Sequence, residues 1–157
     1  MTSKSFFEGI EHHFHNKLPF VVFRHPNQSK LTAFLDIGTS EKSNEKFIVS
    51  PFDSSTYFSI NSHKILNLDY NSEIATPKSK EIEWLDLENK HIEHTNLIRK
   101  ALSSIQESPL KKVVLATSLR YNGAVNSPLS YFKKILAQYT NTFNYLLFHP
   151  DYGVWMG

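Results

Sequence analysis

The stretch that most constrains the fold runs from Leu110 to Thr117, because it joins an apolar run to a lysine pair. Val113 to Ala116 contains no polar residue and starts with two β-branched valines. A continuous apolar run of this length, without alternation, is typical of a strand that is covered on both faces. The sequence therefore predicts a central strand in which Lys111 and Lys112 directly precede the apolar run.

The lysine pair allows two interpretations. An amine that is partly withdrawn from water at the edge of a protein interior loses its proton more readily, so its neutral form can act as a base near neutral pH. Alternatively, Lys111 and Lys112 are solvated residues that flank a hydrophobic strand and oppose its aggregation. Spacing alone favours the solvated interpretation.

An amphipathic helix is predicted directly before this strand, between Glu88 and Glu107. Pro109 prevents the helix from continuing, so the end of the helix determines the position at which the lysine pair enters the predicted strand. The apolar side chains of the helix recur at helical spacing and are expected to pack inward. They are Leu97, Ile98, Ala101, Leu102 and Ile105.

The rest of the chain predicts an α+β fold, in which layers of antiparallel sheet pack against helices. Before residue 61, short β-branched or aromatic segments are separated by polar clusters, which is typical of an antiparallel meander. After residue 127, a helix that starts with proline precedes a strand, a tight turn and the beginning of a partner strand. The predicted helices are Ser5 to Asn16 and Pro128 to Tyr139, and the predicted strands are Pro19 to Arg24, Leu31 to Ile37, Lys46 to Phe52, Thr56 to Ile60, Asn144 to Phe148 and Val154 to Gly157.

Residues 61–86 are largely polar and have neither a helical nor a strand period, so a surface connection is predicted there. Scattered apolar residues such as Leu66 and Leu68 are expected to hold this connection against the protein.

Two groups of ionisable residues in the first half are candidates for a site. His12, His13 and His15 lie close together in the predicted first helix, but a metal site would need ligands from elsewhere, and no second cluster with ligand spacing follows. We therefore assign the three histidines to a solvated face. Arg24 and His25 stand together at a strand end and are likewise assigned to solvent rather than to an anion site.

Charge and composition exclude several classes of protein. The 157 residues carry a formal net charge of +2 without a block of like charges, so neither nucleic acid nor an anionic membrane is expected as a partner. With 0 Cys, a disulfide framework and a cysteine zinc site are excluded, which fits a reducing compartment. Since no apolar segment has the length of a membrane span or a signal peptide core, a cytoplasmic protein is expected.

Several blocks of the sequence resemble isochorismate synthase, a chorismate-utilising enzyme related to salicylate synthase, anthranilate synthase component I and aminodeoxychorismate synthase. The similarity covers about His94 to Gly157, with a weaker block at Phe47 to Asp53. The stronger blocks are His94 to Leu102, Leu110 to Leu115, Tyr131 to Tyr139, Phe148 to Pro150 and Trp155 to Gly157.

This resemblance implies a role for one lysine. In the family, the lysine before the Val-Val-Leu strand is the general base that activates water against the chorismate ring, and Lys112 occupies that place. Ammonia-using members carry glutamine there, so the resemblance implies the water-using branch. The implied protein is an isomerase of menaquinone or siderophore precursor biosynthesis that converts chorismate to isochorismate with Mg²⁺. Salicylate synthase shares the lysine and stays an alternative.

Two places near Lys112 differ from the family pattern. The usual glycine in the turn before the strand is represented by Ser108 and Pro109, and the Ser-Arg that commonly follows the strand is Ala116 and Thr117. The Ala116 and Thr117 departure therefore keeps a non-functional remnant as an alternative to an enzyme. A non-catalytic module that reuses the half-fold is a further alternative, which no sequence feature favours.

The family motif Ala-Thr-Pro-Glu, whose glutamate is taken as the general acid, is expected beyond Gly157, and the magnesium-binding glutamates beyond it. The resemblance thus implies that residues 1–157 form the amino-terminal portion of a single chorismate-binding catalytic domain. They would be an incomplete half of the anthranilate-synthase-like fold that ends inside a hairpin. The isolated chain is expected to be inactive, to carry no metal ligands, and to allow association through the exposed edge of its truncated sheet.

Overall fold

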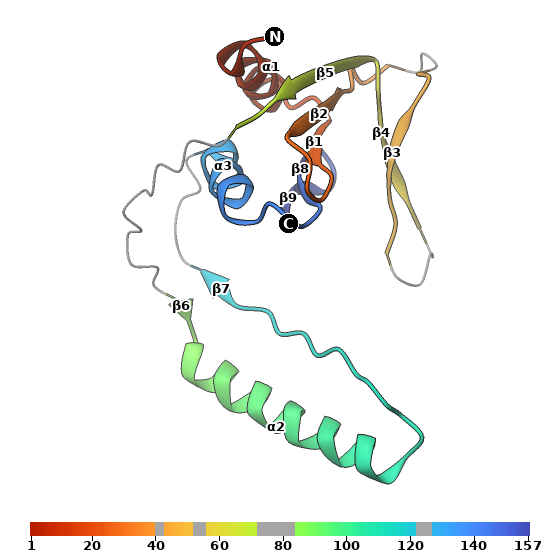
Figure 1. The fold of residues 1–157 in the computed structure, drawn as a ribbon, viewed down its shortest axis with the longest axis vertical. Coiled ribbons are helices and arrows are strands. Elements are labelled where there is room, and N and C mark those ends of the chain that lie inside the picture. The colour runs from red at the N-terminus through yellow and green to blue at the C-terminus, as the bar shows by residue number, and fades with distance from the viewer. Residues whose placement is uncertain (40–42, 52–55, 72–83, 122–126) are drawn as a thin grey trace. The chain divides into compact units, whose positions relative to one another are not determined.

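The computed structural model describes residues 1–39, 43–51, 56–71, 84–121 and 127–157. These residues form an α+β protein with antiparallel sheets and three helices, as the sequence predicts. The chain divides into unit 1, residues 1–75 with 126–157, and unit 2, residues 76–125 (Figure 1). Unit 1 contains α1 (Ser3–His15), β1 (Phe20–Arg24), β2 (Lys30–Leu35), β3 (Lys46–Val49), β4 (Phe58–Asn61), β5 (Lys64–Asp69), α3 (Pro128–Gln138), β8 (Asn144–His149) and β9 (Gly153–Met156), and unit 2 contains β6 (Trp84–Leu85), α2 (Leu87–Glu107) and β7 (Arg120–Tyr121).

Unit 1 is built on a five-stranded antiparallel sheet with the order β5-β2-β1-β8-β9. β1 lies at its centre, where Val22 stands opposite Ala33 of β2 on one side and Leu146 of β8 on the other. Both neighbours pair with β1 along its whole length, so its backbone polar groups are satisfied without water. β5 and β9 form the two edges of the sheet.

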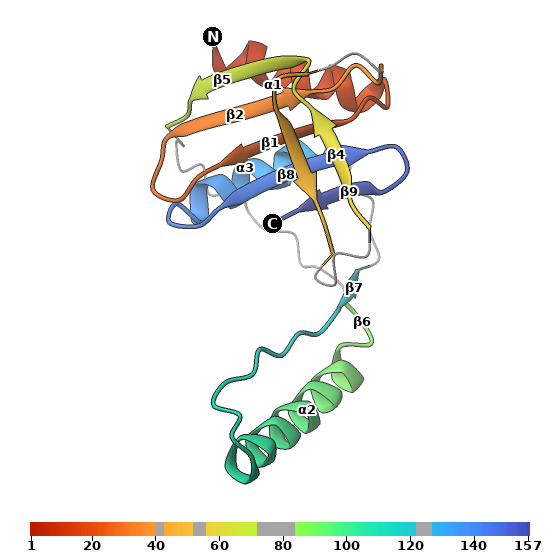
Figure 2. The same ribbon diagram turned by 90° about the vertical axis from the view of Figure 1, so that its right-hand side faces the viewer.

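A different layer covers each face of this sheet (Figure 2). α1 and α3 pack on one face, and the fully buried side chains of this core include Phe6, Ile10, Phe132 and Leu136. The β3–β4 hairpin lies on the other face, where Ile60 packs with buried residues of β1, β2 and β8. The sheet therefore carries a larger core beneath the helices and a smaller core beneath the hairpin.

The first helix forms because its apolar residues recur at helical spacing and its start is capped. The Thr2 side chain accepts a hydrogen bond of 3.2 Å from the backbone N–H of Ser5, which satisfies one of the free donors of the first turn. A Cβ added at Gly9 would lie 3.3 Å from Cδ1 of Leu66, so the glycine lets α1 approach β5 closely.

The carboxyl-terminal part of unit 1 confirms the predicted helix, strand, turn and partner strand. Pro128 stands in the first turn of α3, where its missing N–H costs no hydrogen bond. The turn between β8 and β9 needs Gly153, whose φ of 75° favours a residue without a Cβ. At the same turn, the indole N–H of Trp155 donates to the carbonyl of Tyr152 at 2.8 Å.

The predicted meander is wrong in its pairing. β2 pairs with β5 rather than with β3, and β3 and β4 form a two-stranded sheet of their own. The sequence does not predict β5 because this edge strand buries only Leu66 and Leu68, which the polar Asn67 separates. A strand that is covered on one face needs no more than this alternation. Phe52 and residues 72–83, which belong to a predicted strand and to the predicted connection, lie outside the described residues.

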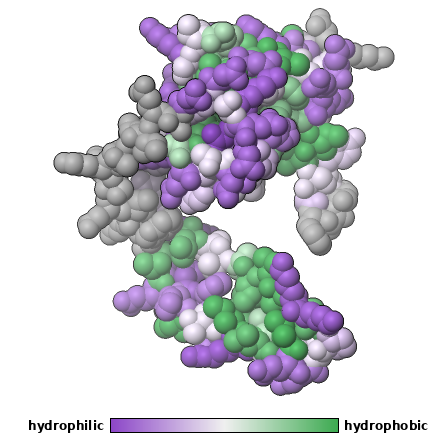
Figure 3. Space-filling model, viewed as in Figure 1, coloured by the Kyte–Doolittle hydropathy of each residue, from purple (hydrophilic) through white to green (hydrophobic). Residues whose placement is uncertain are grey.

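Unit 2 consists of α2, the pair of two-residue strands β6 and β7, and residues 108–119 between α2 and β7. The predicted amphipathic helix is confirmed. None of its residues is buried within the described part of this unit, so nothing there covers the apolar stripe that the sequence predicts to pack inward. Ile92 and Leu102, for example, are exposed. Figure 3 shows apolar side chains gathered on the visible surface of this unit.

Across the described residues, no helix has both the length and the apolar character that crossing a membrane requires.

Candidate functional site

Lys112 lies in unit 2, in the segment that follows α2. Residues 109–119 form neither helix nor strand, and Val113 and Val114 are 41% and 82% exposed. The prediction of a covered strand here is wrong for this structure. A strand needs a neighbour for its backbone hydrogen bonds, and none of the described strands pairs with this segment.

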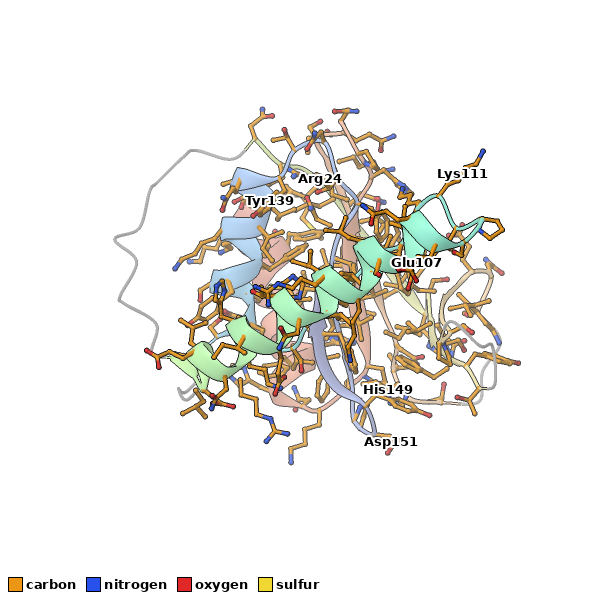
Figure 4. All side chains as sticks on the ribbon, turned by 90° about the horizontal axis from the view of Figure 1, so that it is seen from below. Arg24, Glu107, Lys111, Tyr139, His149 and Asp151 are labelled. Atoms are coloured by element: carbon orange, nitrogen blue, oxygen red, sulfur yellow. The ribbon has the colours of Figure 1, made fainter. Side chains whose placement is uncertain are left out.

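The lysine pair itself is solvated. Both side chains are exposed, and Figure 4 shows that of Lys111 pointing away from the ribbon. Among the described residues, neither amine has a hydrogen-bond or ion-pair partner. The burial on which the base interpretation depends is therefore absent from this conformation, and the role of Lys112 stays a prediction.

Unit 1 contains a cluster of buried polar side chains where β2 ends. Oδ2 of Asp36 accepts hydrogen bonds from the backbone N–H and the side-chain amide of Asn61, at 2.8 and 2.9 Å. Oδ1 of Asp36 accepts from the backbone N–H of Gly38 at 2.8 Å and lies 3.1 Å from Nδ1 of His63. The carboxylate thus ties the end of β2 to the hairpin that covers the sheet.

An aspartate that orients a histidine through Nδ1 is also an arrangement used in proton transfer. Here the side chains of Asp36 and His63 are only 5% and 7% exposed, and both carboxylate oxygens already have partners. A substrate therefore has no access to this pair, and we interpret the pair as structural.

His13 lies near this cluster and differs from the other two histidines of α1. His12 and His15 are exposed, as predicted, whereas His13 is 9% exposed, so its assignment to the solvated face is wrong. Neither of its ring nitrogens forms a hydrogen bond with a described residue. Burial lowers the pKa of His13 because the charged ring would lose its hydration.

Arg24 is also buried, contrary to the predicted solvated pair, with an exposed fraction of 3%. Its Nη2 donates to the carbonyls of Leu136 and Tyr139, both at 2.8 Å, and to Oδ1 of Asn144 at 2.7 Å. Both carbonyls lie at the end of α3 and accept no hydrogen bond from a following turn of the helix, so Arg24 on β1 caps that helix end; Figure 4 labels Arg24 and Tyr139. Burial lowers the pKa of Arg24, yet an arginine keeps its charge in proteins.

The periodicity of the sequence could have predicted the burial of both His13 and Arg24. His13 follows Phe6 and Ile10 at seven and three residues, so it shares their helix face. Arg24 follows Phe20 and Val22 at steps of two, so it shares the face of β1 that carries these core residues. The polar end of each side chain obscures this periodicity, because ionisable residues are seldom buried without partners.

A groove of about 220 Å³ lies on the hairpin face of unit 1. Its described lining is apolar or aromatic apart from one serine and the hydroxyl of Tyr145, so it offers no cation to a carboxylate ligand. It is lined by Phe47, Ile48, Val49, Ser50, Phe143, Tyr145, Leu147 and Trp155. It therefore does not suit a dicarboxylate such as chorismate.

The geometry thus defines an α+β protein whose sheet is covered by two helices on one face and by a hairpin on the other. Comparison with models of known protein families, with curated proteins and with solved structures found no match. The resemblance to the chorismate-utilising enzymes therefore rests on the motif residues alone.

Proposed function

We propose that this chain is part of an isochorismate synthase, with the anthranilate-synthase-like half-fold, in which Lys112 is the general base. The observation that carries the proposal is the order of its motifs. An amphipathic helix and Pro109 lead to Lys112 directly before a Val-Val-Leu run, and the Trp155 to Gly157 block follows. The presence of α2 and of the β8–β9 hairpin, both of which the resemblance requires, supports it.

The proposed chemistry assigns Lys112 one step. A neutral amine takes a proton from water, and the water oxygen then attacks the chorismate ring while the ring hydroxyl leaves. The leaving hydroxide needs a proton from an acid on the opposite side, which the resemblance places beyond Gly157. The amine must therefore be neutral before the reaction, which requires that the complete protein cover residues 110–116 and withdraw Lys112 from water.

The resemblance also implies a magnesium ion that would hold the substrate carboxylate. The described residues contain no group of three or more His, Asp or Glu side chains that could hold a metal ion. The described residues therefore supply no site for this metal, and the role proposed for Lys112 does not depend on it.

The isolated 157-residue chain is expected to leave chorismate unconverted and to show no specific response to Mg²⁺. The physical reason is that the proposed reaction needs an acid opposite the proposed base Lys112, and the resemblance does not assign that acid to any of these 157 residues. The measurement is an assay of purified protein coupled to isochorismate consumption, with chorismate alone as the blank.

Isochorismate formed above the blank would refute this expectation. The positive control is the complete protein to which the segment is proposed to belong, assayed under the same conditions. If the complete protein releases salicylate instead of isochorismate, the salicylate synthase alternative holds. If it leaves chorismate untouched, the proposed function is wrong.

A further inference from the structure

His13 is a buried ionisable side chain on the face of α1 that packs against the sheet. It follows the fully buried Phe6 and Ile10 on that face, and both of its ring nitrogens lack a hydrogen-bond partner among the described residues. A neutral imidazole can be buried here at a modest cost in free energy, because its two ring nitrogens lose hydrogen bonds to water without gaining others. A charged imidazolium does not, because a buried charge needs a partner.

The surrounding charges do not supply that partner. Of the charged side chains nearby, His12 on the same helix and Lys64 on β5 disfavour a charge on His13, and Asp36, just after β2, favours it. The oxygens of Asp36 are already engaged by Gly38, Asn61 and His63.

We propose that His13 makes the docking of α1 pH-sensitive: the helix stays on the sheet while the ring is neutral and is released when the ring takes up a proton. Release would uncover the apolar surface that α1 shares with β5, including Phe6, Phe7 and Leu66. Only a proton needs to bind for this change in the docking of α1. The pH-sensitive docking does not depend on the role proposed for Lys112.

The direction of the effect follows from linkage. Loss of hydration lowers the pKa of His13 in the docked helix below its ordinary value of 6.5. The carbonyl of Gly9 acts in the opposite direction, without meeting the geometry of a hydrogen bond, and so does Asp36. As the pH falls below 6.5, the released helix therefore binds a proton that the docked helix does not. Docking is fully favourable above that pH and weakens below it, by up to about tenfold in its equilibrium constant per pH unit.

Hydrogen exchange of the 157-residue chain at about pH 7.5 and about pH 5.0 tests the proposal, with rates corrected for the intrinsic effect of pH. We expect exchange in α1 to speed up several-fold at the lower pH, while exchange in β1 and α3 changes little. In the variant His13→Leu, which cannot bind a proton at this position, the selective change in α1 should disappear. His12→Gln and His15→Gln are matched controls on the exposed face and should behave like the wild type.

Three results would overturn the proposal. One is wild-type α1 that exchanges no faster, relative to β1, at the lower pH. Another is a His13→Leu variant that keeps the full pH response of α1. The third is loss of the response in His63→Gln but not in His13→Leu, which would assign the effect to the Asp36–His63 pair. If His13→Leu does not fold, the wild-type measurement decides, since selective acceleration in α1 supports the proposal and its absence refutes it.

Discussion

If the proposed function is right, replacing Lys112 with Ala in the isochorismate synthase proposed to contain this chain is expected to cut turnover by roughly a hundredfold or more, the usual scale for a lost general base. The Michaelis constant for chorismate should stay within a few-fold, because a base that acts on water contributes little to binding of the substrate. Steady-state kinetics at saturating and limiting chorismate separate the two quantities. The limb of the pH-rate profile that requires a neutral amine should also disappear in this variant.

Lys111→Ala is the matched control, since the two lysines are neighbours and both are exposed in unit 2. Adjacent residues of a strand point to opposite faces, so only one of them can reach the substrate once the segment is covered. We expect Lys111→Ala to keep most of the turnover. Equal and small effects at both positions would support the interpretation of the pair as solvated flanking residues and would remove the proposed base.

Replacing Arg24 with Met is expected to destabilise unit 1 by about 3 kcal/mol or more, the largest stability effect we predict. Methionine keeps the apolar stem but leaves the carbonyl oxygen of Leu136 and Oδ1 of Asn144 without this donor. The carbonyl oxygen of Tyr139 keeps only the long hydrogen bond of 3.4 Å from the Thr142 hydroxyl. Buried acceptors that lose a charged donor cost their full desolvation. Urea unfolding followed by circular dichroism measures the loss, and hydrogen exchange of β1 assigns it to unit 1.

Lys30→Met serves as the control, because Lys30 is an exposed cation on β2 and its replacement should change the stability by less than about 0.5 kcal/mol. A double-mutant cycle with Asn144→Leu isolates the contact between the two side chains. If Arg24→Met costs no more than Lys30→Met, Arg24 does not hold the end of α3 in place.

Local sequence patterns predict most of the regular elements. The stripe of Phe6 and Ile10 predicts α1, Pro128 predicts the start of α3, and the turn at Gly153 predicts the β8–β9 hairpin, all of which the structure confirms. Patterns of this kind are reliable because helix periodicity, caps and tight turns depend on residues only a few positions apart. The amphipathic character of α2 and its end before Pro109 follow from the same local rules.

Local patterns do not predict which strands pair or which polar side chains are buried. β2 pairs with β5 instead of with β3, Arg24 and His13 turn inward instead of toward water, and the apolar run after Lys112 has no described strand beside it. Each of these outcomes depends on residues that are distant in the sequence, such as the carbonyls of α3 that accept from Arg24. The amino-acid sequence by itself determined the helices, most of the strands and the motif around Lys112. Only the tertiary structure decided pairing and burial, because long-range contacts determine which backbone groups pair and which charges can leave water.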